Sequence, residues 1–289
     1  MQYHLDGKLV PEDEATVSVR DRGFAYGDGA FETLRAYGGT VLAWAAHAER
    51  LEETAATLRF AEAIPPREDL HERVQETLAA NNLEDAYLKL SITRGVQPGK
   101  LTPAERVDPT IVVQASPLPR GGLDGQTVWD EPATLQTVAT RPVPDASIPA
   151  DAKTHNYLNG ILARLELRRS DVQADEALLR DADGHVVEGA TSNLFFVDDG
   201  VLKTPSTALP LLPGVTRSIV LQLADEEGLP VEEGQYTAET VRTADEAFLT
   251  NTTWELRPIE TFDSTPIGGG PMTALLARLY DHRVEQLCY

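Results

Sequence analysis

The sequence predicts an α+β fold of two domains, for three reasons. The chain has 289 residues, 42% of them hydrophobic, which is enough to build more than one core. Strand-like and helix-like patterns alternate over residues 1–117, whereas short strands dominate the rest. Two Pro and three Gly gather in residues 116–125, a composition typical of a connection between domains. We therefore expect a small α/β domain over 1–117, a linker over 118–125 and a larger, β-rich domain over 126–289.

Turn signals and hydrophobic periodicity predict the elements of the first domain. The Asp6-Gly7 and Gly38-Gly39 pairs each separate two apolar stretches, which indicates two β-hairpins. Apolar residues then recur at helical spacing on both sides of Pro65-Pro66. Two hairpins, two helices and two strands are expected in this order: residues 3–11, 30–44, 51–58, 70–78, 86–95 and 109–118.

The second domain begins with a helix and continues as a strand meander. Tyr157, Ile161, Leu162 and Leu165 share one face of the expected helix. Short apolar runs separated by Asp-Gly turns then predict strands between 176 and 205. A further helix is expected to start at Gly214 and to stop before Gly228 and Pro230.

The charge of the chain excludes one class of partner. Asp and Glu total 46 against 25 Lys and Arg, a formal net charge of -21 at pH 7, and so negative a surface repels nucleic-acid phosphates. The acidic excess is spread along the chain, and only five of the basic residues are Lys. We therefore expect no nucleic-acid partner. We interpret the acidic surface as that of a halophilic protein, in which salt screens the repulsion between the negative charges. An ordinary acidic enzyme is the alternative.

The compartment is predicted from cysteine usage and from the N-terminal segment. The single cysteine, Cys288, cannot form an internal disulfide, which is typical of a reducing compartment. The first 20 residues lack the basic and apolar regions of a signal peptide, and no run of about 18 apolar residues occurs. We expect a cytoplasmic protein with no membrane partner.

Several common catalytic motifs are absent from the sequence. The six His form no i, i+4 pair and have no Cys partner, so no metal site is expected. No G-x-S-x-G motif occurs, and Gly27-Asp28-Gly29 is too short for a dinucleotide fingerprint.

Two charged residues in apolar surroundings are candidates for chemistry instead. Lys153 precedes an apolar-faced helix in a chain with few lysines, and Schiff-base formation requires a desolvated amine. A solvated lysine is the alternative. Glu188 lies within an apolar strand, where a carboxylate needs a partner such as a protonated heterocycle to stay charged.

Three further segments could bind an anion. Gly214-Val215-Thr216 starts a helix, whose free N–H groups and dipole attract anions, with a plain helix N-terminus as the alternative. Asn251-Thr252-Thr253 supplies hydroxyl and amide groups in a turn, and Arg50 ends a helical run. Together they could hold a phosphate, but sequence spacing does not show that they meet.

Six segments, in the same order, resemble the class IV aminotransferases. These fold type IV pyridoxal-phosphate enzymes include branched-chain aminotransferases, D-amino-acid aminotransferases and 4-amino-4-deoxychorismate lyases. The segments are DRGFAYGDGAFETLR at 21–35, HAERL at 47–51, AKTHNYLN at 152–159, EGATSNLFF at 188–196, LPGVTR at 212–217 and FLTNTTWELRPI at 248–259. They span nearly the whole chain, so a two-domain fold of this type is the expected architecture.

The resemblance implies pyridoxal 5'-phosphate as the cofactor and Lys153 as the catalytic residue. Lys153 would form a Schiff base with the cofactor and move the substrate proton, while Glu188 would keep the pyridine nitrogen protonated. The implied phosphate ligands are Arg50, the amides of Val215 and Thr216, and Thr252. The other implied cofactor contacts are Tyr157, Leu212 on the ring face, and Ser192, Asn193 and Thr253; for the last three, hydrogen bonding within turns is the alternative.

The resemblance also implies a set of substrate-binding residues, although it does not decide the subfamily. The set consists of Tyr26, Phe31, Thr33, Arg35, Lys89 and Arg94; for Tyr26 and Phe31, a place in the core is the alternative. D-amino-acid aminotransferases carry a Tyr, an Arg and a His where this chain has Phe31, Arg94 and Val96, so D-specificity is disfavoured. The branched-chain enzymes match at Phe31-Glu32 and in part at Tyr87-Leu88-Lys89. The lyases match at Thr33 and over 88–95, but not at 97–100.

We therefore predict a pyridoxal-phosphate-dependent aminotransferase that transfers the amino group of an α-amino acid, with the branched-chain type favoured, to a 2-oxo acid. A 4-amino-4-deoxychorismate lyase, releasing pyruvate and 4-aminobenzoate, is the alternative, because both enzymes would use Lys153 and the same cofactor. A non-catalytic binding protein is a remote alternative, since Lys153 and Glu188 are unfavourable in apolar surroundings without the cofactor. The resemblance also implies a homodimer.

Overall fold

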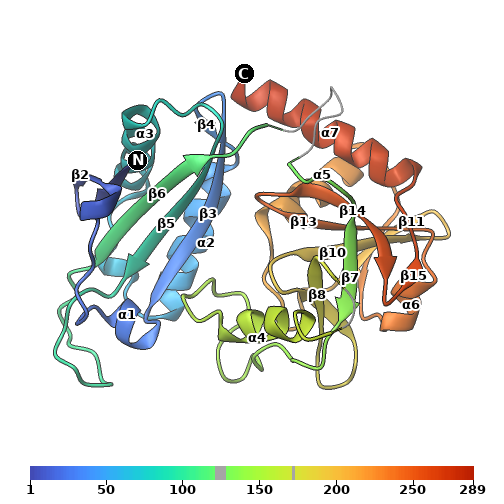
Figure 1. Ribbon diagram of the computed structural model, residues 1–289, viewed down its shortest axis with the longest axis horizontal. Helices are drawn as coiled ribbons and strands as arrows, with labels where there is room; N and C mark the ends of the chain where they lie inside the picture. Colours follow the sequence, from blue (N-terminus) through green and yellow to red (C-terminus); the bar gives the residue numbers. More distant parts are fainter. Residues whose placement is uncertain (121–127, 171–172) are drawn as a thin grey trace. The chain divides into compact units, whose positions relative to one another are not determined.

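The computed structural model describes residues 1–120, 128–170 and 173–289, which form two compact units (Figure 1). Unit 1 consists of Met1–Arg120, Ala152–Asn156 and Val284–Tyr289, and unit 2 of Gly121–Asp151 and Tyr157–Arg283. Both units combine helices with a sheet, so the predicted α+β class is confirmed.

Unit 1 is built on a six-stranded antiparallel sheet with the strand order β2-β1-β6-β5-β3-β4. The strands are β1 (Gln2–Leu5), β2 (Lys8–Pro11), β3 (Gly29–Tyr37), β4 (Thr40–Val41), β5 (Ala86–Thr93) and β6 (Thr110–Pro117). The helices are η1 (Glu12–Glu14), α1 (Arg22–Tyr26), α2 (Trp44–Thr57), η2 (Ala61–Ala63) and α3 (Arg67–Ala80). Both predicted hairpins and both predicted helices are confirmed.

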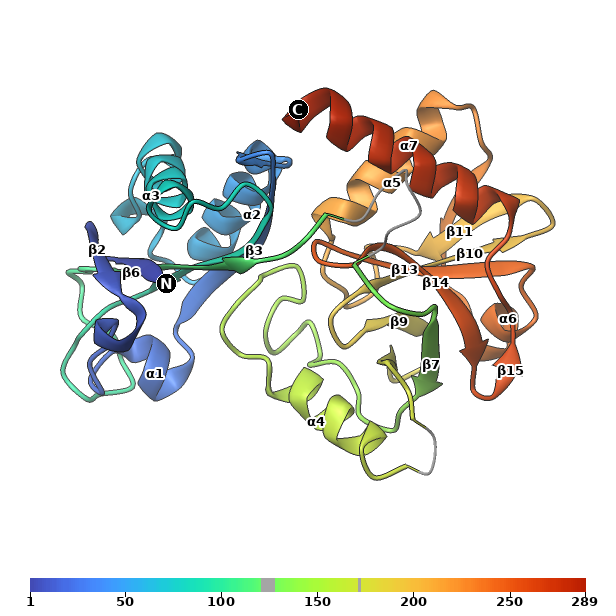
Figure 2. The same cartoon turned by 45° about the horizontal axis from the view of Figure 1, so that its top comes forward.

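Helices α2 and α3 lie on one face of this sheet (Figures 1 and 2). Successive residues of a strand point to opposite faces, and in β3 the even-numbered apolar residues, such as Leu34, pack with Leu51 of α2 and Val74 of α3. The odd-numbered residues of β3, beginning with Phe31, therefore lie on the face away from the helices. The alternation in β3 separates the core of unit 1 from a second, partly polar face.

Unit 2 is built on a nine-stranded mixed sheet with the order β12-β11-β10-β13-β14-β7-β8-β9, and β15 pairs with β14. The strands are β7 (Ala133–Thr137), β8 (Glu176–Arg180), β9 (Val186–Gly189), β10 (Asn193–Asp198), β11 (Val201–Pro205), β12 (Val231–Gly234), β13 (Glu246–Asn251), β14 (Glu255–Phe262) and β15 (Thr265–Pro266). The helices are α4 (Leu158–Leu167), α5 (Val215–Glu226), α6 (Ala238–Arg242) and α7 (Pro271–Cys288), of which the residues from Val284 onward belong to unit 1. Its core includes Phe195 stacked on Phe248, with ring centroids 5.1 Å apart.

The division into units differs from the predicted domains in two places. The boundary at Arg120 falls within the predicted linker, whose residues 121–125 lie outside the described part. However, Ala152–Asn156 and Val284–Tyr289 belong to unit 1 rather than to a continuous second domain. Backbone pairing with β3 draws in the first segment, and the second is held by the hydrogen bond from the Tyr289 hydroxyl to Asp85. Composition can suggest a linker, but it contains no signal for segments that return to the first unit.

Helix α4 exposes the apolar face that its sequence pattern indicated. Its buried residues are Gly160, Ala163 and Leu167, whereas Ile161 is 54% exposed and Leu162 is 49% exposed. Two small residues and Leu167 therefore pack α4 onto unit 2, whereas Ile161 and Leu162 remain at the surface of the single chain.

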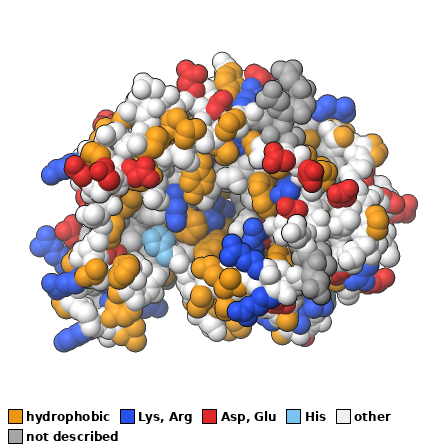
Figure 3. All heavy atoms as spheres, in the orientation of Figure 1, with side chains coloured by type: hydrophobic (Ala, Val, Ile, Leu, Met, Phe, Trp, Pro, Cys, Tyr) orange, Lys and Arg blue, Asp and Glu red, His pale blue; other side chains and the backbone are white. Residues whose placement is uncertain are grey.

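Two further observations concern the helices and the charged surface. Across the described part of the chain, every helix is either too short or too polar to cross a membrane. Asp and Glu side chains are distributed over the face drawn in Figure 3, with Lys and Arg side chains between them.

Candidate active site

The predicted site residues fall into both units. Unit 1 contains Lys153, Arg50 and all six predicted substrate-binding residues. Unit 2 contains the other predicted cofactor ligands, namely Tyr157, Glu188, Ser192, Asn193, Leu212, Val215, Thr216, Thr252 and Thr253.

Lys153 is held in place by backbone pairing with the first residues of β3. The Phe31 N–H donates to the Lys153 carbonyl at 3.1 Å, and the His155 N–H donates to the Gly29 carbonyl at 2.9 Å. The Lys153 N–H donates to the Thr54 hydroxyl of α2 at 3.0 Å. These bonds use main-chain atoms, so they fix the position of the lysine without involving its amine.

The Phe31 ring brings two amines together on the sheet face opposite the helices. Lys153 Nζ lies 4.6 Å from the ring centroid and Lys89 Nζ lies 4.9 Å from it. Burial lowers the pKa of Lys89 below its ordinary value, and the charge of Lys153 lowers it further. The structure therefore places Phe31 and Lys89 beside Lys153.

Arg50 is held by a buried carboxylate that the sequence analysis did not select. Its Nε and Nη2 atoms donate to the two oxygens of Glu32 at 2.8 and 2.6 Å, and His47 Nδ1 lies 2.7 Å from Glu32 Oε2. Burial alone would raise the pKa of Glu32, but the charge of Arg50 and the hydrogen bonds from Arg50 and His47 hold it at about 2. Glu32 thus stays ionised and fixes the guanidinium of Arg50.

A sequence signal for this carboxylate exists. Glu32 shares its face of β3 with the apolar residues Ala30 and Leu34, where a charged group requires a partner. His47 and Arg50 are three residues apart on α2 and therefore point the same way. The alternation in β3 together with helix spacing could have indicated the cluster.

Three other predicted substrate-binding residues have different surroundings. Thr33 shares the face of Phe31 and hydrogen-bonds Tyr87 on β5. Arg35 is buried, and its Nη2 donates to the Pro119 carbonyl at 2.9 Å. Tyr26 is 46% exposed at the end of α1, with the Arg22 guanidinium 4.9 Å from its ring centroid. Thr33 is thus near the amines, whereas Arg35 and Tyr26 make contacts elsewhere in unit 1.

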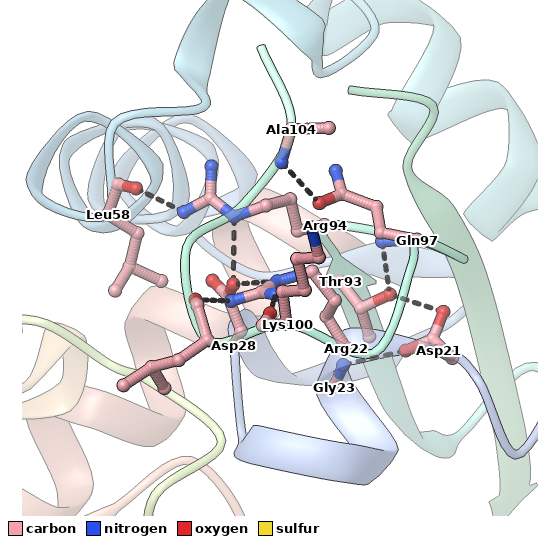
Figure 4. A network of polar contacts seen from close by, with 12 residues as sticks. Asp21, Arg22, Gly23, Asp28, Leu58, Thr93, Arg94, Gln97, Lys100 and Ala104 are labelled. Carbon is pink, nitrogen blue, oxygen red and sulfur yellow. Dashed lines mark hydrogen bonds and ion pairs between the residues drawn. The ribbon is translucent and has the colours of Figure 1, made fainter. Parts of the chain in front are cut away.

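Arg94 belongs to a buried polar network (Figure 4). Its Nε donates to Asp28 Oδ2 at 2.8 Å and its Nη2 donates to the Leu58 carbonyl at 2.5 Å. Arg22 Nε donates to the same oxygen of Asp28 at 2.7 Å. Burial would raise the pKa of Asp28, but the two arginines outweigh it and lower the pKa.

Arg22 also ties this network to the segment after β5. Its Nη1 donates to the Lys100 carbonyl at 2.7 Å and its Nη2 donates to the Leu101 carbonyl at 2.9 Å (Figure 4). The contacts of Arg94 and Arg22 therefore support the local fold of unit 1 and do not bring Arg94 to the Phe31 ring.

In unit 2, the Glu188 carboxylate is positioned by two donors. The Leu212 N–H donates to Oε2 at 3.1 Å, and Asn193 Nδ2 lies 3.4 Å from the same oxygen. Asn193 Nδ2 also donates to the Leu212 carbonyl at 2.9 Å. The structure thus brings together Glu188, Asn193 and Leu212, three residues of the predicted set.

The segment after Leu212 leads into the N-terminus of α5. Gly214 is the N-cap residue, and no side chain caps the helix. A Cβ at Gly214 would lie 2.1 Å from Asn193 Oδ1, so only glycine fits against that amide. Val215 and Thr216 are buried in the first turn, where backbone N–H groups and the helix dipole favour an anion.

The remaining cofactor candidates of unit 2 lie in turns. Ser192 Oγ is 3.2 Å from Glu176 Oε2, and both the N–H and the hydroxyl of Thr253 donate to Asn251 Oδ1 at 3.0 Å. Hydrogen bonding within a turn, the alternative role, is therefore present for Thr253, whereas the Ser192 hydroxyl bonds a carboxylate on β8. Thr252 lies between β13 and β14, and Tyr157 directly precedes α4.

Glu176 is a second organising carboxylate that the sequence analysis missed. It is fully buried, and its Oε2 accepts hydrogen bonds from the N–H of Thr191 at 3.2 Å and from its hydroxyl at 2.6 Å. These contacts shape the turn between Glu188 and Asn193. No local pattern in the sequence indicates this role.

The turn between β8 and β9 carries a small group of potential metal ligands. Ligand atoms of Asp181, Asp183 and His185 lie within 4.8 Å of one another. Asp181 Oδ1 already accepts the N–H groups of Asp183 and His185 at 3.0 and 2.8 Å, which is the bonding of a polar turn.

Comparison with known proteins establishes the family. The family model described as "Amino-transferase class IV" matches residues 29–262. A putative branched-chain-amino-acid aminotransferase of Methanocaldococcus jannaschii is 39% identical over 96% of this chain and 94% of its own length. The chain belongs to the class IV aminotransferase family, as its sequence motifs predicted.

Two solved structures are similar over nearly the whole chain. The branched-chain aminotransferase of Thermoproteus uzoniensis, solved with norvaline, has a TM-score of 0.88 and 32% identity, covering 98% of this chain and 94% of that one. The 4-amino-4-deoxychorismate lyase of Pseudomonas aeruginosa has a TM-score of 0.81 and 31% identity, covering 99% and 100%. The predicted fold type is confirmed.

Proposed function

We propose that this chain is a pyridoxal 5'-phosphate-dependent aminotransferase that moves the amino group of a branched-chain α-amino acid to a 2-oxo acid. The observation that carries the proposal is the position of Lys153, whose amine lies 4.6 Å from the Phe31 ring centroid while its backbone is hydrogen-bonded to β3. An amine fixed against an aromatic ring in a partly buried setting suits a Schiff-base lysine. The branched-chain relative from Methanocaldococcus jannaschii supports the substrate class.

The residues of unit 2 fit this cofactor. Glu188 is an oriented carboxylate of the kind that pairs with a protonated pyridine nitrogen, since two donors hold its Oε2. The N-terminus of α5 has no side-chain cap, so its backbone N–H groups suit a phosphate. Gly214 leaves room beside this N-terminus for the Asn193 side chain, which also orients Glu188. In unit 1, Glu32 fixes Arg50 by two hydrogen bonds, as a phosphate-binding guanidinium requires.

The proposed roles follow from these contacts. Bound pyridoxal 5'-phosphate supplies an electrophilic carbon and a ring that draws electrons from the amino acid Cα. The Lys153 amine would bind covalently to that carbon. Once released as the free amine, it would carry the proton to and from the substrate. Glu188 would hold the proton on the ring nitrogen. Phe31, Thr33 and Lys89 would line the substrate side of the sheet in unit 1.

A visible absorption titration tests the proposal. The purified protein in concentrated KCl should carry a cofactor absorption band that L-leucine or L-valine removes and that a 2-oxo acid restores. Lys153→Ala should abolish turnover, whereas normal turnover in that variant would reject the assignment of Lys153. A colourless protein that cannot take up the cofactor would favour a binding protein on the same fold.

A 4-amino-4-deoxychorismate lyase is the second candidate. Two observations favour it. Thr33, at which the lyases match this chain, lies on the same face as Phe31 and beside Tyr87. The match to the Pseudomonas aeruginosa lyase covers the full length of that protein. A lyase would keep its absorption band when amino acids are added and would release pyruvate and 4-aminobenzoate from aminodeoxychorismate.

We further propose that the chain forms a homodimer. The apolar side chains that α4 exposes lie at helical spacing and make a stripe typical of a protein interface; they are Leu158, Ile161, Leu162 and Leu165. Sedimentation equilibrium in concentrated KCl should give twice the mass of the chain, and a monomer at micromolar concentration would reject the proposal.

The acidic composition supports a high-salt cytoplasm. The net charge of -21 makes the chain repel itself in dilute buffer. We expect the activity and the dimer to be lost below about 0.1 M KCl, where the Debye length exceeds about 10 Å. Full activity in dilute buffer would favour an ordinary acidic enzyme.

A further inference from the structure

Arg217 is a buried cation in the first turn of α5, directly after Val215 and Thr216. Its side chain is only 4% exposed. The dipole of a helix makes its N-terminal turn positive, so a second positive charge is unfavourable there. A cation kept in this position therefore needs contacts that offset the cost.

The Arg217 guanidinium holds two strands of the sheet in unit 2. Its Nη2 donates to the carbonyl of Pro205, the last residue of β11, in a buried hydrogen bond of 3.0 Å. The same nitrogen forms an ion pair with the Glu233 carboxylate of β12. The two strands are paired in parallel, with Pro205 opposite Gly234. One side chain thus joins α5 to the C-terminal ends of both strands.

The contact with Pro205 also closes the segment between β11 and α5. This segment, residues 206–214, starts directly after Pro205 and ends where α5 begins. It carries Leu212, whose N–H donates to Glu188 Oε2 at 3.1 Å. Because Arg217 lies in the first turn of α5, its bond to the Pro205 carbonyl ties the two ends of the segment together.

The interior of the segment is held on the sheet by packing and by backbone bonding. Leu209 and Leu211 are buried against Val187 of β9. The Ser206 N–H donates to the Gly234 carbonyl at 2.9 Å. These contacts fix the segment from the side of the sheet, and the guanidinium connects it to the helix.

We propose that Arg217 is a positioning residue for the cofactor phosphate, because it fixes the first turn of α5 relative to β11 and β12. The N–H groups of Val215 and Thr216 are then held where both can bind one anion. This inference rests on the proposed function, which assigns these two N–H groups to the phosphate. It adds a residue that acts through the helix.

The charges at this turn favour an anion as well. Glu233 is paired with Arg217, but its side chain is 43% exposed, so solvent screens its negative charge. The Arg217 cation and the helix dipole both contribute positive potential at the N-terminus of α5. A bound phosphate would offset the cost of placing a cation in the first turn.

Two unreactive forms of the cofactor measure this role. Pyridoxine 5'-phosphate and pyridoxine differ only in the phosphate, and neither carries the aldehyde that reacts with Lys153. Calorimetric titration of the apoprotein gives the ratio of their dissociation constants, which we call the phosphate preference. Arg217→Met removes both contacts of the guanidinium and should lower the phosphate preference about tenfold. Equal weakening of both ligands, the result of a merely structural role, would overturn the inference.

Arg283→Met is the matched control, because it removes a cation at the opposite end of the same helix. Arg283 Nη2 donates to Glu226, the last residue of α5, at 2.6 Å. This variant should keep the phosphate preference of the wild type. An equal loss in Arg283→Met and Arg217→Met would overturn the specific role of Arg217.

A second variant keeps the inference testable if Arg217→Met does not fold. Arg217→Lys retains the charge, but the lysine amine reaches one bond less far than Nη2 and lacks the planar fork of the guanidinium. It should therefore lower the phosphate preference as well. A wild-type preference in Arg217→Lys would assign the effect to charge alone and would overturn the positioning role.

The phosphorus resonance of the holoenzyme provides a spectroscopic readout. In ³¹P NMR, the resonance of the bound cofactor should change its chemical shift in Arg217→Lys and should stay in place in Arg283→Met. An unchanged resonance in Arg217→Lys would contradict the inference.

The outcomes also separate this inference from the proposed function. If the wild type binds pyridoxine 5'-phosphate no better than pyridoxine, the phosphate site of the proposed function fails. If the wild type prefers the phosphate and both Arg217 variants keep that preference, only the role of Arg217 fails.

Discussion

Replacing Glu32 with Gln should destabilise the protein strongly, because the change removes the charge between two buried partners. Glu32 is 1% exposed and accepts two hydrogen bonds from Arg50 and one from His47. Gln has nearly the same size, so Glu32→Gln changes charge and hydrogen bonding with little change of volume. Arg50 would keep its charge in a buried site and lose the carboxylate that balances it.

The structure gives the magnitude in two ways. The pKa of Glu32 is about 2 in the folded chain against an ordinary value of 4.5, and this difference corresponds to about 3 kcal/mol of stability. Removing one partner of a buried ion pair costs about 3–5 kcal/mol. We therefore expect the free energy of unfolding at pH 7 to fall by about 3 kcal/mol.

The same interaction predicts a pH dependence with a definite sign. Because folding lowers the pKa of Glu32, its contribution is complete above pH 4.5 and is lost as the pH falls toward 2. Urea unfolding in 2 M KCl, followed by circular dichroism, measures the difference between wild type and Glu32→Gln at several pH values. The difference should be largest at pH 7 and should shrink steadily below pH 4.5.

An exposed ion pair between α2 and α3 provides the control. Glu52 accepts two hydrogen bonds of 2.6 Å from Arg67, but both side chains are more than a third exposed. Exposed pairs contribute about 0–1 kcal/mol, so Glu52→Gln should change the free energy of unfolding by less than about 1 kcal/mol. A Glu32→Gln effect no larger than that of Glu52→Gln, or one that does not change with pH, would refute the reasoning.

Three further substitutions have defined outcomes. Gly214→Ala would place a methyl group 2.1 Å from Asn193 Oδ1, so it should weaken cofactor binding about tenfold or more in titrations of the apoprotein; unchanged affinity would contradict this. Asp28→Asn removes the carboxylate that Arg22 and Arg94 share and should lower the free energy of unfolding by about 3 kcal/mol, measured in urea; a loss under about 1 kcal/mol would argue against that role. Ile161→Glu puts a charge on the exposed stripe of α4 and should shift sedimentation toward monomer, whereas an intact dimer would exclude this stripe from the interface.

Local signals in the sequence account for most of the elements. The Asp6-Gly7 turn predicts its hairpin because both residues adopt positive φ, as this turn requires. The helix that begins at Val215 was predicted from Gly214 and the periodicity that follows. Such features depend on residues close together in the chain, and the sequence displays them directly.

Partners far apart in the chain were not predicted, even where the residue itself was selected. Arg50 was selected as a phosphate ligand, but its pairing with Glu32, 18 residues earlier, depends on how α2 packs on β3. Arg94 was selected for substrate, yet its Nε pairs with Asp28, 66 residues earlier. Residue type indicates that a charged group needs a partner, but only the folded sheet determines which partner it meets.

Side chains of β3 alternate between the two faces of the sheet, so one strand contributes to stability on one face and to substrate recognition on the other. Even positions carry Ala30, Glu32 and Leu34 against α2 and α3, where Glu32 holds Arg50. Odd positions carry Phe31 and Thr33 on the opposite face, where Lys153, Lys89 and His155 gather. Substitutions of Glu32 and Leu34 should therefore change the free energy of unfolding first, and those of Phe31 and Thr33 should change substrate choice while the fold persists. A single strand can contribute to both stability and recognition because successive residues point to opposite faces of the sheet, so a shift of one residue moves a side chain to the other face.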